Sequence, residues 1–411
     1  MSIDQRTRRY DGIRDLSLEE IVDSVIPTAV AAHGDLAARG ARFLELPPLG
    51  FGVGDAGFTL AAGDEGMRVA AGVGGGTIVA ELDEPALSRL LQDEQTAMGL
   101  AMTSDVRLTR GRLDDWIAWE PVLRALLDGR PVHEPGAIQL VDGDGGPLDL
   151  DRAFTLEDDP EELRQFLTEA GFVHLRGVFT PDEMAVISAD LDRALETAQP
   201  DDGASWWATD ADGRERPVRI LWFEEHSDAL AALLADPRLT WLAALTGDGH
   251  QPPTSAEGLV KPLDIVRGLS DLPWHKDCGQ GHHSYVCNGL TVGISVTGAD
   301  RDSGALGVIP GSHRANTLSA TRDRRLDLAP RKLETETGDI TVHCSDTLHR
   351  AHPPTKAPRK VVYTSLRLAP LPGDRLPAGM PNSATRRDRA GLTSVEDRIE
   401  AADGGQTRLG G

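Results

Sequence analysis

The stretch PWHKDCG, residues 273–279, contains a histidine and an aspartate two positions apart. In an extended strand alternate side chains point to the same face, so His275 and Asp277 project together while Lys276 points away. One imidazole nitrogen and one carboxylate oxygen on one face suit a single metal ion. This spacing is common by chance, so the prediction of a metal site depends on a third ligand elsewhere in the chain.

Three histidines offer that third ligand. The stretch TGDITVHCSDTLHRAHPP, residues 337–354, predicts a turn and a strand followed by His349 and His352, with His343 inside the strand. His343 becomes the ligand if the strand register differs, and His352 is expected in an exposed turn. The residues by themselves leave this choice open.

The surrounding elements predict an antiparallel double sheet. Residues 290–297, LTVGISVT, alternate between apolar and small polar side chains, which is typical of a half-buried strand. SGALGVIPGSH (303–313) predicts a turn, a short strand and a second turn, and RKVVYTSLRL (359–368) is rich in strand formers. Helices followed by many short strands favour a jelly roll, also called a double-stranded β-helix, with flanking helices.

The chain is long enough for two domains and divides into four parts. Residues 1–135 predict a smaller N-terminal α+β domain, because a capping pair, Ser17 and Glu20, precedes a helix and strands then alternate with helices. Residues 136–154 are expected to be a Gly/Pro/Asp-rich linker, 155–370 the jelly-roll domain, and 371–411 a polar, partly disordered tail. The overall fold class is therefore α+β.

The composition excludes several functions. A formal net charge of -23 disfavours nucleic acid and anionic membrane surfaces as partners. No apolar run long enough for a membrane span and no secretion signal occurs, so a cytoplasmic protein is expected. The three cysteines, Cys278, Cys287 and Cys344, lack the spacing of a zinc site or a disulfide framework and are expected to be free thiols.

The motif GVGDAG, residues 52–57, matches a dinucleotide-binding fingerprint but lacks its context. Phosphate binding requires the glycine turn to open a helix, whereas FTLAAG, which follows, predicts a strand. We expect a glycine-rich loop here.

A resemblance to a known family rests on motifs that occur in one order. These are FLTEAGFVHLRGVFTPDEM, Lys261-Pro262, PWHKDCG, SGALGVIPGSH, and Gly338-Asp339 followed by a histidine and, ten residues later, an arginine. Over about residues 155–370 this set resembles the phytanoyl-CoA dioxygenase family of iron(II)/2-oxoglutarate oxygenases. The resemblance implies a double-stranded β-helix, Fe(II) as the metal, 2-oxoglutarate as cosubstrate, and O2 and a small molecule as the other reactants.

The resemblance also implies the roles of individual residues. The family's distal histidine lies eleven residues after the glycine of the GD turn, which selects His349 to complete the triad with His275 and Asp277. Arg359 would hold the distal carboxylate of 2-oxoglutarate, and Lys261 would face the cosubstrate or substrate. A serine that the family often has two residues after the distal histidine is Ala351 here, and Thr364 or Ser365 is expected to replace it.

The predicted function is hydroxylation of a C–H bond in a small, lipid-like or natural-product substrate. Related halogenases replace the aspartate by a small residue, so Asp277 favours hydroxylation. One alternative is a lipid- or ligand-binding protein with a non-catalytic oxygenase fold, and another is a cupin-like enzyme that needs no 2-oxoglutarate. The first region loosely resembles the sterol-carrier-protein type of lipid-binding domain, with GRLDDWIAWEPVLRALLDGRP as its closing segment.

Overall fold

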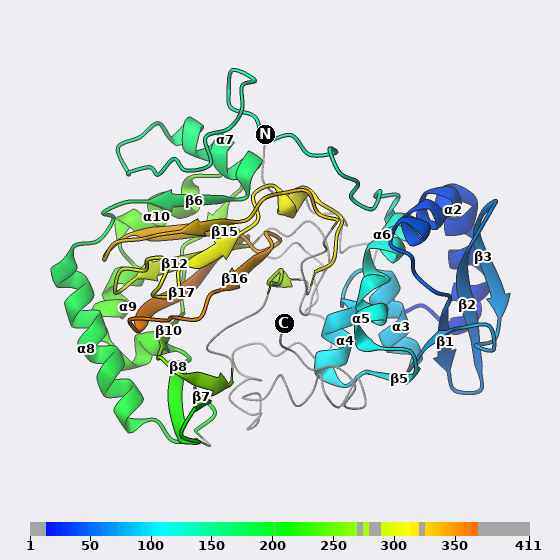
Figure 1. Cartoon of the computed structure of the whole chain (residues 1–411), viewed down its shortest axis with the longest axis horizontal. Coiled ribbons are helices and arrows are strands. Elements are labelled where there is room, and N and C mark those ends of the chain that lie inside the picture. Colours follow the sequence, from blue (N-terminus) through cyan, green and yellow to red (C-terminus); the bar gives the residue numbers. More distant parts are fainter. Residues whose placement is uncertain (1–13, 201, 269–273, 279–288, 320–324, 369–411) are drawn as a thin grey trace.

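The computed structural model describes residues 14–200, 202–268, 274–278, 289–319 and 325–368. They form two units that lie side by side and are joined by one connecting segment (Figure 1). We call residues 14–132 the N-terminal unit and residues 154–368 the C-terminal unit. Each unit has its own hydrophobic core, one built from residues between Leu16 and Val132 and the other from residues between Phe154 and Leu366.

The N-terminal unit packs helices against one five-stranded sheet. Its strands follow the order β3-β2-β1-β4-β5, with β1 and β4 parallel and the other neighbours antiparallel. Its elements are α1 (Leu18–Glu20), the π-helical turn η2 (Ile21–Val25), α2 (Ile26–Phe43), β1 (Leu49–Val53), β2 (Ala56–Gly63), β3 (Gly66–Ala71), β4 (Ile78–Leu82), α3 (Glu84–Leu91), α4 (Ala97–Thr103), β5 (Val106–Arg110), α5 (Leu113–Ala118) and α6 (Glu120–Asp128).

The C-terminal unit is a double-stranded β-helix with flanking helices. A nine-stranded sheet has the order β11-β7-β8-β10-β17-β12-β15-β6, with β9 paired to β17, and a three-stranded sheet has the order β14-β13-β16. Its elements are α7 (Pro160–Ala170), β6 (Phe172–Leu175), α8 (Pro181–Thr197), β7 (Ser205–Asp210), β8 (Glu215–Ile220), η3 (Phe223–His226), α9 (Asp228–Leu234), α10 (Pro237–Ala244), β9 (His250–Gln251), β10 (Ala256–Lys261), β11 (Ile265–Arg267), β12 (Leu290–Ser295), β13 (Leu306–Val308), η5 (Ser312–Arg314), β14 (Arg331–Leu333), β15 (Ile340–Cys344), β16 (His349–Ala351) and β17 (Arg359–Leu368).

The predicted α+β class and jelly roll are confirmed, and local signals account for several boundaries. Thr180 caps α8 in a full capping box with Glu183, and α7 begins after Asp159 and ends at Gly171, whose φ is +77°. The fingerprint-like motif GVGDAG forms the turn between β1 and β2, so it opens no helix. Leu49–Val53, which overlaps the start of this motif, is a strand because it pairs with both β2 and β4.

Other expectations are modified or lie outside the described residues. The closing segment GRLDDWIAWEPVLRALLDGRP forms two helices, α5 and α6, with Pro121 at the start of the second. Cys278 is disulfide-bonded, which contradicts the expectation of a free thiol, while Cys344 is free and buried. The tail from residue 371 lies outside the described residues, and the sterol-carrier resemblance of the first region stays a prediction. Among the described residues, no helix is both long and apolar enough to cross a bilayer.

Two places in the C-terminal unit, Asn316 and the stretch from Arg325 to Asp327, contact the N-terminal unit or the start of the connecting segment. Asn316 donates from Nδ2 to the carbonyl oxygens of Pro121 and Arg130, at 2.9 and 3.0 Å, and its own carbonyl accepts from the backbone N–H of His133 at 2.9 Å. The His133 ring nitrogen Nε2 lies 2.9 Å from a carboxylate oxygen of Asp327. Pro121 at the start of α6, Arg130 just after this helix and His133 in the connecting segment are therefore bonded to the C-terminal unit.

The turn before β15 is held by tight backbone packing. Gly338 has φ +88°, and a Cβ there would lie 1.9 Å from the carbonyl oxygen of Phe179. The adjacent Asp339 carboxylate accepts from the backbone N–H groups of Gly177 and Glu336, both at 2.8 Å, and lies 2.9 Å from Nε2 of His174. This turn therefore joins the strand that leads toward His349 to the segment after β6.

We expect Gly338→Ala to destabilise the protein more than the matched variant Gly213→Ala. Gly213 has a similar φ of +78° but nothing within 4 Å of an added Cβ, so its variant carries only backbone strain of about 1–2 kcal/mol. The clash at position 338 should add about 1–3 kcal/mol. Urea unfolding of both variants measures the difference, and equal losses would contradict the packing argument.

Candidate active site

Backbone hydrogen bonds bring the two stretches that contain histidine together. His275 donates its N–H to the His349 carbonyl at 2.9 Å, and His349 donates to the His275 carbonyl at 3.0 Å. His349 begins β16 and pairs with Val308 of β13, while Asp277 donates its N–H to the carbonyl of Ser345 at 2.8 Å. The two imidazole rings consequently lie 4.1 Å apart, although 73 residues separate them in the sequence.

His275, Asp277 and His349 form a cluster that could hold a metal ion. One ligand atom from each lies within 4.8 Å of the others. The Nε2 atoms of His275 and His349 are each 3.4 Å from Oδ1 of Asp277. Two imidazole nitrogens and one carboxylate oxygen on one side of an ion leave the opposite positions open, which is the donor set of non-haem iron(II) oxygenases.

Hydrogen bonds orient two of these side chains. Nδ1 of His349 lies 2.9 Å from the Thr347 carbonyl, to which it donates, so Nε2 is left with a lone pair for a metal. Oδ2 of Asp277 accepts from the hydroxyl of Thr291 at 2.7 Å, which leaves Oδ1 facing the histidines. Supporting contacts of this kind are typical of built metal sites.

The charge state of Asp277 suits a metal ligand. Burial acts to raise the pKa of this carboxyl group, but the neighbouring imidazoles of His349, His275 and His343 outweigh burial and hold the pKa well below its usual value. The carboxylate is therefore ionised at neutral pH and needs no deprotonation to bind a cation.

A pocket opens beside the cluster. Its apolar wall consists of Leu259, Leu306, Ala351 and Val361, and its polar lining is Arg219, Glu257, Lys261, His275, Asp277, Thr291, His343, His349 and Tyr363. Most of these side chains come from alternate positions of strands in the large sheet. The pocket thus lies between the metal cluster and the inner face of that sheet.

Two buried cations, Lys261 and Arg359, face each other across β10 and β17. Lys261 lines the pocket and its Nζ donates to the His352 carbonyl at 2.5 Å. Arg359 is only 2% exposed, donates from Nη1 to the Gly304 carbonyl at 2.8 Å, and has an Nε without a hydrogen-bond partner.

These cations provide a test of whether the site fits 2-oxoglutarate. Within the part of the chain that the structure describes, no ion pair joins Arg359 to a carboxylate. A buried guanidinium without a counter-charge is costly, and a diacid bound from the metal cluster toward β17 would supply that charge. The residues present therefore fit 2-oxoglutarate. Arg359 lies behind the residues that line the pocket and is not itself one of them.

Thr364 does not reach the pocket. Its hydroxyl donates to the Ser255 carbonyl at 2.6 Å, and the alternation of β17 places it on the face opposite Val361 and Tyr363. Ser365 shares the face of those two residues, so of the two candidates it is the one on the pocket side. The prediction that Thr364 contacts the cosubstrate is wrong for this reason.

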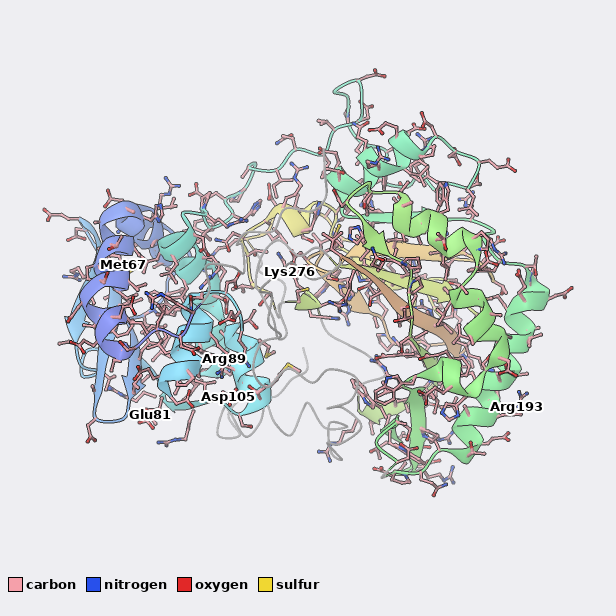
Figure 2. All side chains as sticks on the ribbon, turned by 180° about the vertical axis from the view of Figure 1, so that it is seen from behind. Met67, Glu81, Arg89, Asp105, Arg193 and Lys276 are labelled. Carbon is pink, nitrogen blue, oxygen red and sulfur yellow. The ribbon has the colours of Figure 1, made fainter. Side chains whose placement is uncertain are left out.

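Lys276 points away from the pocket, as expected from strand alternation. Its Nζ donates to the Ala315 carbonyl at 3.1 Å, and its backbone N–H donates to the Ser319 carbonyl at 2.7 Å. Burial lowers the pKa of Lys276 to about 8, although the charge of Asp346 opposes this shift. Figure 2 shows Lys276 between the two units, whereas Arg193 of α8 lies on the outer side.

Several pocket residues were not found from the sequence. Thr291 could have been, because it occupies the polar side of the alternating stretch LTVGISVT. Arg219, Glu257 and Tyr363 carry no such signal. Arg219 donates from Nη1 to Glu257 at 2.9 Å and its guanidinium carbon lies 4.3 Å from the ring centre of Trp206, so a charged pair lines one end of the pocket.

Comparison with known proteins agrees with this geometry. Residues 167–361 match the family model of phytanoyl-CoA dioxygenase, a span that contains the whole metal cluster, Lys261 and Arg359. This part of the chain therefore has the sequence pattern of the phytanoyl-CoA dioxygenase family. The family's coarse function is that of an iron(II)- and 2-oxoglutarate-dependent oxygenase. No curated protein matches the chain.

Solved structures are similar to the phytanoyl-CoA dioxygenase part in fold. The non-haem α-ketoglutarate-dependent epimerase SnoN from nogalamycin biosynthesis is 21% identical with a TM-score of 0.43, and the match covers 51% of this chain and 83% of SnoN. EctD from S. alaskensis is 17% identical with a TM-score of 0.44, and the match covers 58% of this chain and 84% of EctD. The carbocyclase SnoK is 19% identical with a TM-score of 0.41, covering 53% and 87%.

We expect Thr291→Val to weaken Fe(II) binding about 10- to 100-fold, because it removes the hydroxyl that orients Asp277 in the dioxygenase cluster. Thr341→Val is the control for the same change of residue, since Thr341 lies on the neighbouring strand β15, is more deeply buried than Thr291 and does not line the pocket. Anaerobic Fe(II) titration of both variants gives the dissociation constants. Unchanged affinity in Thr291→Val would show that the hydroxyl does not orient the carboxylate.

Proposed function

We propose that the chain is an iron(II)- and 2-oxoglutarate-dependent hydroxylase acting on a C–H bond of a small molecule. The observation that carries the proposal is the His275–Asp277–His349 cluster, which opens onto a pocket backed by the buried guanidinium of Arg359, whose Nε has no hydrogen-bond partner among the described residues. In this proposal His275, Asp277 and His349 hold the metal, Arg359 binds the distal carboxylate of 2-oxoglutarate, and Lys261 adds a second positive charge.

Iron held by these residues, together with 2-oxoglutarate and O2, would supply the oxidising chemistry needed for an unactivated C–H bond. The protein's part is to position the reactants. Asp277, kept ionised by its surroundings, and His349, oriented by Thr347, present fixed ligand atoms. The apolar side chains Leu259 and Val361 lie between the polar end of the pocket and the cations Lys261 and Arg359. They keep water away from this middle part of the pocket.

The pocket supports a substrate of mixed polarity. Its apolar wall accepts a hydrocarbon portion, while the Arg219–Glu257 pair and the phenol of Tyr363 offer hydrogen bonds to a polar group. This supports a functionalised small molecule over an unsubstituted acyl chain. We also propose that the boundaries of the two units correspond to two domains, residues 1–135 and 155–370, joined by the segment 136–154.

Two competing functions remain testable. SnoN and SnoK are described as an epimerase and a carbocyclase, so product analysis has to separate hydroxylation from other outcomes of hydrogen abstraction. A ligand-binding protein without turnover would bind the metal or a ligand but release no succinate. The complete donor set together with the buried guanidinium of Arg359, which a protein that uses no 2-oxoglutarate would not need, supports turnover over such a binding role.

We expect His275→Ala and Asp277→Ala each to abolish 2-oxoglutarate-dependent succinate release and the visible charge-transfer band of the Fe(II)–2-oxoglutarate complex. Each variant loses one of only three metal ligands, so the coordination set is incomplete. Succinate is measured with and without candidate substrates, and products are examined for an added oxygen atom. Normal succinate release by either variant would refute the assignment.

We expect Arg359→Met to raise the dissociation constant for 2-oxoglutarate about 10- to 100-fold, because hydrogen bonds to a charged group are lost. Lys360→Met is the matched control, since Lys360 points to the other face of β17 and its Nζ contacts Ser188 and Asp192 on α8. Titration followed by the charge-transfer band measures both affinities. Equal effects of the two changes would mean that Arg359 does not bind the diacid.

A further inference from the structure

His343 is a buried histidine of the pocket to which neither the triad nor the cosubstrate site assigns a role. It lies on β15, is 1% exposed and lines the pocket beside the metal cluster. Both of its ring nitrogens are buried and lack a hydrogen-bond partner. Leaving a buried polar group unpaired costs about 1–3 kcal/mol, so a function that uses one of these nitrogens is expected.

The nearest acceptor to His343 is the carboxylate of Asp277. Nε2 of His343 lies 3.6 Å from Oδ2 of Asp277, and its ring centre lies 4.2 Å from that of His349. His343 also stands directly opposite Thr291 in the β12–β15 pairing, and Thr291 already donates to the same Oδ2. Two donors on adjacent strands thus face one carboxylate oxygen.

The geometry argues against His343 as a fourth metal ligand. Its nitrogen faces Oδ2, whereas His275 and His349 face Oδ1 at 3.4 Å, and the group of mutually close ligand atoms contains those two histidines and Asp277 only. A fourth protein ligand would also leave two of six positions open, too few for a bidentate diacid and O2 together.

We propose that His343 is a positioning residue of the metal centre, which donates its Nε2–H to Oδ2 of Asp277 when Oδ1 binds the metal. A movement of roughly half an ångström brings the pair into hydrogen-bond range. Oδ2 is then held by Thr291 from one strand and His343 from the next, so the carboxylate binds through Oδ1 alone. The inference rests on the proposed function only in that the cluster binds a metal ion.

The first experiment compares His343→Phe with His343→Gln. Phenylalanine keeps the ring volume but removes the donor, and glutamine keeps an N–H donor near the position of Nε2. We expect the Fe(II) dissociation constant to rise about 10- to 100-fold in His343→Phe and less than threefold in His343→Gln. Anaerobic Fe(II) titration of the full chain measures both.

Urea unfolding of the metal-free protein separates positioning from a structural role. His343→Phe removes two unpaired buried nitrogens, so the metal-free variant should be as stable as the wild type or more stable. Weaker Fe(II) binding together with unchanged stability supports the inference. A destabilised variant that binds Fe(II) normally, or equal losses of affinity with phenylalanine and glutamine, would overturn it.

A double-mutant cycle with Thr291→Val tests whether both donors act on one oxygen. Because either donor can partly hold Oδ2 alone, the effects on Fe(II) affinity should not add. The charge-transfer band should move to longer wavelength in each single variant, since a carboxylate freed of a hydrogen bond donates more electron density to iron. Additive affinities with an unmoved band would overturn the inference. If the wild-type protein binds no Fe(II), the proposed function is wrong. If the wild type binds Fe(II) but the variants give the contradicting results above, only the inference about His343 is wrong.

Discussion

The site depends on the reciprocal hydrogen bonds between the backbones of His275 and His349. Two hydrogen bonds of 2.9 and 3.0 Å join the segment that contains the H-x-D motif to the start of β16. They place two imidazoles on one side of the same short bridge and leave Asp277 two residues further along one of its strands. Backbone pairing therefore sets the separation of the ligands, which favours a preorganised metal site.

Strand alternation in β10 and β17 sets which charged side chains lie on the same face as this bridge. Along β10 and β17 the facing pairs are Lys261 with Arg359, Leu259 with Val361, and Glu257 with Tyr363. A cationic pair, an apolar pair and a polar pair therefore follow one another at intervals of two residues. Under the proposed function a diacid would bind at the cationic end and a polar substituent at the other end, with the apolar pair between them.

The same alternation explains how far the sequence could predict the site. The spacing in PWHKDCG was sufficient for His275 and Asp277, because a period of two needs no knowledge of the partner strands. The choice of His349 as the third ligand depended on the family resemblance, because His343 and His349 both follow the same turn. Only the strand pairings distinguish them, since His343 pairs in β15–β6 and His349 in β13–β16. Thr364 was misplaced because one residue of register reverses the face of a strand. The disulfide of Cys278 had no signal in the spacing of the cysteines.

The N-terminal unit is connected to the metal cluster through a few residues. The segment from Ala315 to Ser319 accepts two hydrogen bonds from Lys276, which lies between two ligands. Asn316 within this segment is bonded to Pro121 at the start of α6, to Arg130 and to His133. Lys276 and Asn316 are buried, so water does not compete freely for the hydrogen bonds that these two side chains make. A displacement of the N-terminal unit would have to break these bonds or move the segment that bears His275 and Asp277. The position of the first unit is thus a constraint on the geometry of the second unit's active site.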